Sequence, residues 1–165
     1  MVCCFMFYLC KTVVSCKSMG FVQWGRNEMK IVSVDKLTPE EYFEIYSSVD
    51  WRGLRFSQIA GMLERSSHTF ALYEGKKLVG MARLCGEISS FIYLNDFIIK
   101  PEYQNEGYGR FLLSYIVEFI RSNKPEEKKV KLEVLSARGK EEFYISNGFK
   151  SFGDDYSGRR LFEYL

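Results

Sequence analysis

A short glycine-containing loop carries the residue types that bind an anion. Residues 104–110 read Gln-Asn-Glu-Gly-Tyr-Gly-Arg and stand between an apolar strand and an amphipathic helix. Gly107 and Gly109 let the backbone approach a ligand without an intervening Cβ, and Arg110 adds a positive charge. The first N–H groups of the following helix have no partner within it, and the helix dipole is positive at that end. The loop therefore predicts a site for a phosphate-like oxyanion.

Two common phosphate-binding motifs do not fit this loop. A nucleotide-triphosphate P-loop has Lys and then Ser or Thr after its last glycine, where this chain has Arg110 and Phe111. A dinucleotide-binding fingerprint has a third glycine three positions after the second, where this chain has Leu112. The sequence therefore gives little support to either motif.

The loop instead resembles the acyl-CoA pyrophosphate loop of the GNAT acyltransferase superfamily. The resemblance rests on the pattern Gln104-x-x-Gly107-x-Gly109, which follows a strand ending at Pro101. It extends over residues 29–165 and includes an aromatic pair before a Gly-Phe turn near residue 148. The resemblance implies an α/β (α+β) fold, in which about four helices flank a mixed sheet of six or seven strands. Two splayed parallel strands would lie at the cofactor site.

Acetyl-CoA is the cosubstrate that the resemblance implies. Its pyrophosphate would lie on the glycine loop, and its pantetheine arm would enter the gap between the two splayed strands. The residues expected to bind it are Phe97, Ile98, Ile99, Gln104, Asn105, Glu106, Gly107, Tyr108, Gly109 and Arg110.

Tyr144 is the residue that the resemblance assigns to acid catalysis. It occupies the position at which many GNAT members place a tyrosine that protonates the leaving thiolate. An asparagine often found seven residues earlier, in contact with the cofactor, is replaced here by Ala137. That substitution puts the corresponding cofactor contact in doubt.

Asp96 is our candidate for the base, either directly or through a neighbouring water. Alternation along the expected central strand, residues 91–99, places it on one face with Leu94 and Ile98. A carboxylate among apolar neighbours must find hydrogen-bonding partners or bear a desolvation cost. A structural, hydrogen-bonded role and a catalytic role both remain open. Glu87 and Glu133 are weaker candidates.

The acyl acceptor is expected to be a primary amine. The resemblance favours a small molecule of the aryl-alkyl amine or polyamine type, with Trp51 and Arg83 as substrate-binding residues. Trp51 by itself is also a candidate for helix packing. A protein N-terminus or lysine is the alternative acceptor. A non-catalytic acyl-CoA-binding sensor is the alternative of another class. Many relatives form homodimers through their final strands, and the sequence leaves that open.

Strands and helices alternate along the part of the chain that would position these residues. A helix should begin at Thr38, with Pro39 in its first turn and Glu41 completing a capping box. A strand, a helix and a strand in succession predict parallel pairing across the glycine loop. The expected strands cover residues 30–34, 68–73, 77–84, 91–99, 130–134, 149–152 and 161–165, and further helices begin near residues 57, 110 and 141.

Composition argues against several other functions. The chain has 165 residues, of which 47% are hydrophobic, so we expect one domain with a sizeable core. A formal net charge of +2 does not favour nucleic acid as a partner. The five cysteines contain no Cys-x-x-Cys spacing and His68 is the single histidine, so no metal site is expected.

The first 28 residues differ from the rest of the chain. They hold four of the five cysteines and begin with an apolar stretch that is too short to span a bilayer and lacks the basic start of a secretory signal. We interpret residues 1–28 as an extension, poorly ordered or outside the domain, and residues 29–165 as the GNAT domain. The isolated thiol of Cys85 indicates a reducing, cytoplasmic setting. No membrane partner is expected, because the apolar start is too short to span a bilayer.

Overall fold

One mixed β-sheet runs through the molecule. The computed structural model describes residues 13–16, 19–24, 29–49, 51–151 and 160–165. Within them, nine strands pair in the order β1-β2-β3-β4-β5-β6-β7-β9-β8. The strands are β1 (Val13–Cys16), β2 (Met19–Trp24), β3 (Met29–Val34), β4 (His68–Glu74), β5 (Lys77–Glu87), β6 (Phe91–Ile99), β7 (Lys131–Leu135), β8 (Lys150–Ser151) and β9 (Arg160–Tyr164).

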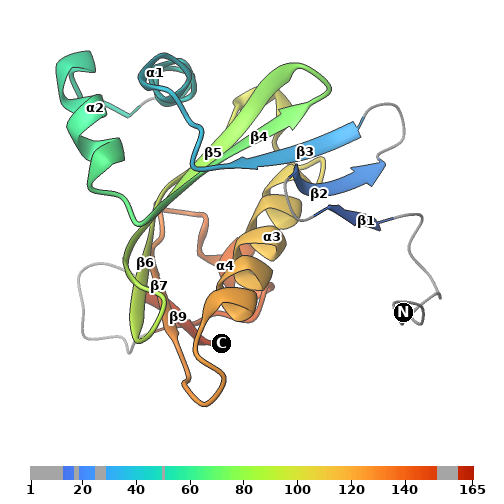
Figure 1. Ribbon diagram of the computed structural model, residues 1–165. Helices are drawn as coiled ribbons and strands as arrows, with labels where there is room; N and C mark the ends of the chain where they lie inside the picture. Colours follow the sequence, from blue (N-terminus) through green and yellow to red (C-terminus); the bar gives the residue numbers. More distant parts are fainter. Residues whose placement is uncertain (1–12, 17–18, 25–28, 50, 152–159) are drawn as a thin grey trace.

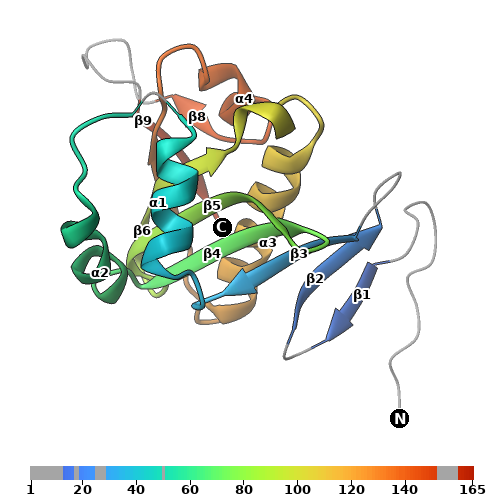
Figure 2. The same cartoon turned by 90° about the horizontal axis from the view of Figure 1, so that it is seen from above.

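Four α-helices among the described residues cover the two faces of this sheet. They are α1 (Pro39–Ser47), α2 (Phe56–Glu64), α3 (Tyr108–Asn123) and α4 (Glu141–Ile145), and a 3₁₀ turn, η1 (Pro101–Tyr103), precedes α3. Helices α1 and α2 lie on one side and α3 and α4 on the other (Figures 1 and 2). Neighbouring strands are antiparallel except β6 and β7, which α3 connects in parallel, as predicted. This arrangement confirms the expected fold class. None of the described helices is both long and apolar enough to cross a membrane.

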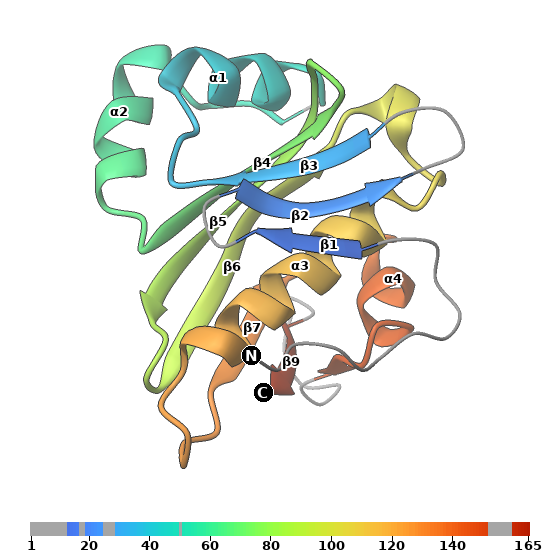
Figure 3. The ribbon, with the colours of Figure 1, turned by 45° about the vertical axis from the view of Figure 1, so that its right-hand side comes forward.

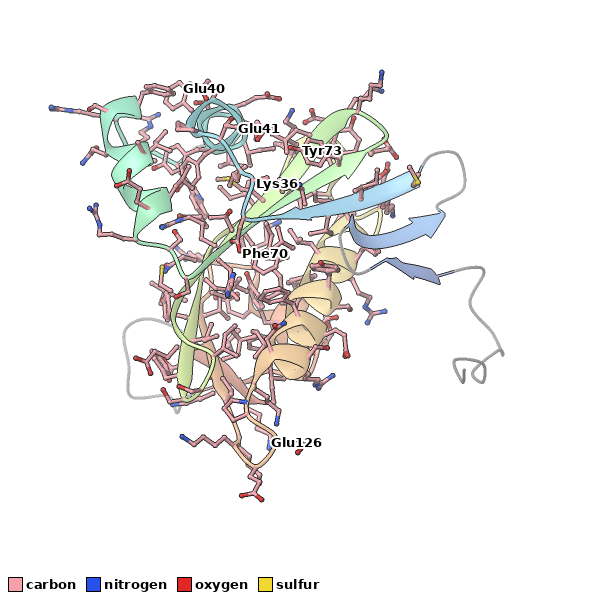
Figure 4. All side chains as sticks on the ribbon, viewed as in Figure 1. Lys36, Glu40, Glu41, Phe70, Tyr73 and Glu126 are labelled. Carbon is pink, nitrogen blue, oxygen red and sulfur yellow. The ribbon has the colours of Figure 1, made fainter. Side chains whose placement is uncertain are left out.

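Each face of the sheet has its own hydrophobic core. Phe70 and Leu72 of β4 point toward α3, whereas Ala71 between them joins the core beneath α1 and α2. Figure 4 shows Phe70 and Tyr73 on opposite sides of this strand, and the Tyr73 hydroxyl donates a hydrogen bond to Glu41 of α1. The period of two in a strand produces this division. The sheet is therefore held between two independent layers of helices.

Helix α1 begins where the sequence predicts. The Thr38 side chain accepts a hydrogen bond from the Glu41 N–H at 3.2 Å, and the Glu41 carboxylate accepts one from the Thr38 N–H at 3.0 Å. Pro39 occupies the first turn, where its missing N–H has no consequence. This capping box, together with the buried Tyr42 and Ile45, fixes α1 on the sheet.

A bulge divides β6 into two parts. Ala82 of β5 faces two residues of β6, Asp96 and Phe97, and the φ of Asp96 is 46°. The extra residue reverses the alternation, so Leu94 and Ile98 enter different cores, and the predicted common face is wrong beyond the bulge. Pairing of β6 with β7 ends at Leu94. The two parallel strands therefore separate beyond that point, as expected for the fold.

Strands β1 and β2 come from the segment interpreted as an extension. Strand β2 pairs with β3, and the two strands continue the sheet beyond β3 (Figure 3). Seven of the described strands, β3 to β9, lie within residues 29–165, in line with the expected six or seven, and β1 and β2 bring the described total to nine. Residues 1–12, 17–18 and 25–28 lie outside the described residues, and the domain boundary at residue 29 stays a prediction.

Candidate active site

A cavity of about 650 Å³ occupies the gap where β6 and β7 separate. Its walls come from β6, the loop before α3, the end of β7, helix α4 and the loop between α1 and α2. Pairing of β6 with β7 ends at Leu94, just before the bulge, so residues 95–99 of β6 have no strand partner on the β7 side. The fold therefore brings the sequence-predicted loop, strand and tyrosine to one place.

The N-terminus of α3 faces this cavity without a side-chain cap. Gly107 is the N-cap residue, with a φ of 85°, and the first backbone bond of the helix runs from the Phe111 N–H to the Gly107 carbonyl at 3.0 Å. The N–H groups of Tyr108, Gly109 and Arg110 precede that bond, so the helix itself offers them no acceptor. Together with the helix dipole they form a cradle for an anion.

The two glycines of the loop have different reasons to be glycine. The left-handed φ of Gly107 disfavours any residue with a side chain, although a Cβ there would meet nothing within 4 Å. A Cβ on Gly109 would lie 3.3 Å from the Phe143 ring of α4. The left-handed backbone explains the first position, and the packing of α3 against α4 explains the second.

Two cations and two amides surround the cradle. Lys140, directly before α4, donates to Gln104 Oε1 at 3.3 Å, and Gln104 Nε2 donates to the Ile99 carbonyl at 2.9 Å. Arg110 Nε donates to Asn147 Oδ1 at 3.3 Å. Lys140 and Asn147 line the cavity but were not predicted. The place of Lys140 was foreseeable, because the parallel pairing of β6 with β7 puts the start of the helix after β7 at the same sheet edge as the glycine loop. No sequence signal pointed to Asn147.

Asp96 is held by partners from two other elements. Its Oδ2 accepts hydrogen bonds from the Tyr42 hydroxyl at 2.7 Å and from Arg83 Nε at 2.6 Å. Arg83 is 8% exposed, and its Nη1 donates to the Met62 carbonyl and Ser66 Oγ at the end of α2. Burial, and then the bond to Asp96, raises the pKa of Tyr42, so its hydroxyl remains a donor. Asp96 lines the cavity with one carboxylate oxygen engaged.

Tyr144 lies in the wall of the cavity and is 6% exposed. Its ring contacts the rings of Phe97, Phe143 and Phe149 at centroid distances of 6.2, 5.0 and 5.5 Å. Burial, and secondarily Tyr93, raises the pKa of the Tyr144 hydroxyl well above its usual value. The group therefore keeps its proton at neutral pH and can act as a proton donor.

The remaining predicted residues divide between the cavity and its surroundings. Trp51 lines the cavity from the α1–α2 loop and is 41% exposed. Arg83 lies behind Asp96 and does not line the cavity. Glu106 does not line it either, and the Tyr108 side chain points into the core, where its hydroxyl donates to Glu74. Tyr108 does not line the cavity, and it contributes to the cradle through its N–H group at the helix start.

The other acidic candidates lie apart from the cavity. Neither Glu87 nor Glu133 lines it, and Glu133 is buried in an ion pair with Lys131 at 2.5 Å. Among the residues that the structure describes, no group of three His, Cys, Asp or Glu side chains is arranged to hold a metal ion. Asp96 is therefore the one acidic side chain among the described lining residues.

Comparison with known proteins identifies the family. Residues 65–151, more than half of the chain, match the model of the acetyltransferase (GNAT) domain. The chain belongs to the GNAT family. It is an acetyl-CoA-dependent N-acetyltransferase, as expected from the glycine loop. No curated protein sequence matches this GNAT chain.

Solved structures share the same GNAT fold. A probable acetyltransferase from meticillin-resistant Staphylococcus aureus has a TM-score of 0.68 and 22% identity, over 79% of this chain and 96% of that one. The ribosomal-protein-S18-alanine N-acetyltransferase from Escherichia coli has a TM-score of 0.63 and 19% identity, over 83% and 93%. N-acetylglutamate synthase from Neisseria gonorrhoeae, solved with coenzyme A and L-arginine, has 0.60 and 18%, over 81% and 33%.

Proposed function

We propose that this GNAT enzyme transfers an acetyl group from acetyl-CoA to a small primary amine with an aromatic body. One observation carries the proposal: a single cavity is lined both by the cationic cradle at α3 and by an aromatic wall that holds one carboxylate. The first feature suits a diphosphate, and the second suits an ammonium group attached to a flat apolar group.

The residues around the cradle fit coenzyme A. The uncapped N–H groups at the start of α3 and the side chains of Arg110 and Lys140 would hold the diphosphate. The backbone of residues 97–99 has no strand partner on the β7 side and would hold the pantetheine arm. Bound there, acetyl-CoA supplies an acyl group as a thioester. Ala137 lines the same cavity, without the side-chain amide that many relatives use.

Two side chains of the wall would move protons during transfer. Asp96, held by Tyr42 and Arg83, would accept a proton from the attacking amine, directly or through a water. As the new N–C bond forms and the C–S bond breaks, Tyr144 would give its proton to the departing sulfur. The Tyr144 hydroxyl carries its proton at neutral pH, as an acid must when the sulfur leaves, and its raised pKa makes the release of that proton harder. The assignment therefore rests on the place of Tyr144 in the cavity wall.

The character of the wall favours an aryl-alkyl amine over a polyamine. Trp51, Tyr93 and Phe97 supply aromatic surface beside Asp96. A polyamine carries several positive charges along its length and calls for several carboxylates, whereas the described lining has one. An aromatic amine needs one carboxylate and a flat apolar surface. A peptide N-terminus or a lysine side chain is the competing acceptor.

Thiol release with a panel of acceptors tests the proposal. The purified chain is titrated calorimetrically with acetyl-CoA and then assayed with phenethylamine, spermidine, an alanine-terminated peptide and a lysine peptide. Release with phenethylamine at the highest kcat/KM supports the proposal. Preferential release with either peptide, or with spermidine, overturns the acceptor assignment. A chain that binds no acetyl-CoA overturns the assignment of the cradle.

A matched pair of variants tests the aromatic wall. Trp51→Ala should raise the KM for the amine about tenfold or more and leave the affinity for acetyl-CoA unchanged, because Trp51 lies on the α1–α2 side of the cavity. Phe56→Ala is the control, since Phe56 is similarly exposed, at 46%, but does not line the cavity. Equal effects of the two substitutions would contradict the role of Trp51.

A further inference from the structure

The side chain of Tyr108, the first residue of α3, is anchored on strands β3 and β4. Tyr108 is 4% exposed, and its hydroxyl donates a hydrogen bond to the Glu74 carboxylate at the end of β4. The ammonium group of Lys30 on β3 lies 3.9 Å from the centroid of the Tyr108 ring. The Tyr103 ring packs edge-on against the same ring, at 5.4 Å. One aromatic side chain is thus contacted by a cation, a carboxylate and a second ring.

Lys30 and Glu74 form one unit around that ring. They are direct cross-strand partners in the antiparallel pairing of β3 with β4. The cation lies over the ring face, where the quadrupole is negative, and the carboxylate accepts the hydroxyl proton. Burial lowers the pKa of Lys30, and the charges of Glu74 and Glu106 oppose that effect. The acidic neighbours therefore help to keep the Lys30 charge in place.

The anchored residue belongs to the anion cradle through its backbone. The N–H of Tyr108 is the first of the three at the start of α3, and Gly107 before it has open space around its Cα. The Glu106 side chain is exposed, so it does not fix the helix end of the loop by a buried contact. Gln104 is tied at the other end of the loop, to the Ile99 carbonyl. The Tyr108 side chain is consequently the buried anchor on the helix side.

We propose that Lys30 and Glu74 are positioning residues for coenzyme A: by gripping the Tyr108 ring they fix the cradle and set the affinity for the diphosphate. The proposal rests on the binding of coenzyme A to that cradle. Strand β3 does not line the cavity. Lys30 on this strand should nevertheless affect the binding of coenzyme A, and it should have no effect on the binding of the amine.

Two lysines beside the same carboxylate allow a matched test. Lys30 and Lys77 are the two cross-strand neighbours of Glu74, one on β3 and the other on β5, and the cation–π contact is made by Lys30. Lys30→Met should raise the Kd for coenzyme A roughly three- to tenfold in calorimetric titration of the full chain, whereas Lys77→Met should leave it unchanged. Lys30→Arg, which retains a cation able to lie over a ring, should restore most of the affinity.

Steady-state kinetics separates positioning from a general loss of structure. Lys30→Met should raise the KM for acetyl-CoA by the same factor, with kcat and the KM for the amine unchanged. Glu74→Gln keeps an acceptor oxygen for the Tyr108 hydroxyl but removes the charge, so it should raise the KM for acetyl-CoA by a smaller factor. This variant replaces Lys30→Met in the test if Lys30→Met does not fold. Equal Kd values for Lys30→Met and Lys77→Met, or a parallel rise in the amine KM, overturn the proposal. Absence of binding to the unsubstituted chain overturns the cradle itself.

Discussion

Removal of one oxygen atom from Tyr144 separates acid catalysis from packing. In Tyr144→Phe the ring remains, and so do its contacts with Phe97, Phe143 and Phe149 at 5.0–6.2 Å. The core therefore loses no apolar volume, and the free energy of unfolding should change by less than about 1 kcal/mol. Tyr144 lines the cavity from α4 and does not belong to the α3 cradle, so the affinity for coenzyme A should be unchanged.

The catalytic step should suffer much more. A positioned general acid contributes roughly a hundred- to ten-thousandfold to a rate, which corresponds to about 3–5 kcal/mol in the barrier. Because burial raises the pKa of Tyr144, the acid stays protonated through the usual assay range. The unsubstituted enzyme should therefore show no alkaline loss of kcat from this group below about pH 10, the ordinary value for tyrosine. Any stability that the raised pKa provides is likewise present below that pH and lost above it.

The assay is thiol release at saturating acetyl-CoA and amine, together with calorimetric titration of coenzyme A. Tyr115→Phe is the matched control, because Tyr115 is a partly buried tyrosine of α3 whose ring packs on Phe70 outside the cavity. It should keep kcat within about twofold, whereas Tyr144→Phe should lower kcat at least a hundredfold. If Tyr144→Phe retains kcat within about threefold, the assignment of the acid is refuted.

Four further substitutions test the frame of the site. Asp96→Asn should lower the free energy of unfolding by about 2–4 kcal/mol in urea titration, because Arg83 loses its counter-charge in a nearly buried pair, and should lower kcat/KM for the amine at least tenfold. Gly107→Ala and Gly139→Ala impose the same left-handed strain without a clash, so each should lose about 1–2 kcal/mol, but only Gly107→Ala should weaken coenzyme A binding. Thr38→Ala removes the α1 cap and should lower Tm by about 2–4 °C in a thermal scan, with the Kd for coenzyme A unchanged.

Local patterns were readable from the sequence because their causes are local. The α1 capping box depends on Thr38 and Glu41, three positions apart, and the structure has both of its hydrogen bonds. Gly75 in the β4–β5 turn and Gly148 after α4 both have positive φ, a backbone conformation that glycine adopts readily. The glycines of residues 104–110 likewise predict a helix that begins without a side-chain cap. Each of these features is decided within a few residues.

Features that depend on distant partners were not readable. Asp96 is bonded to Tyr42, 54 positions away, and to Arg83, 13 positions away, and no pattern around Asp96 indicates either one. Arg83 was predicted to bind substrate from the resemblance alone, whereas in the structure it lies beneath Asp96. The β6 bulge contains no glycine or proline, the residues that often indicate a bulge in a sequence. The side chains of β6 were therefore expected to alternate between the two faces of the sheet through Ile98.

The bulge itself shows why the cavity cannot be attributed to local sequence. An aspartate at a φ of 46° adopts a conformation that L-residues with a side chain visit at a cost of about 1–2 kcal/mol, so surrounding contacts must offset that cost. The hydrogen bonds from Tyr42 on α1 and from Arg83, which is itself fixed to the end of α2, meet this requirement. The bulge beside which β6 leaves β7 is therefore supported by side chains from α1 and β5, and by the end of α2 that holds Arg83.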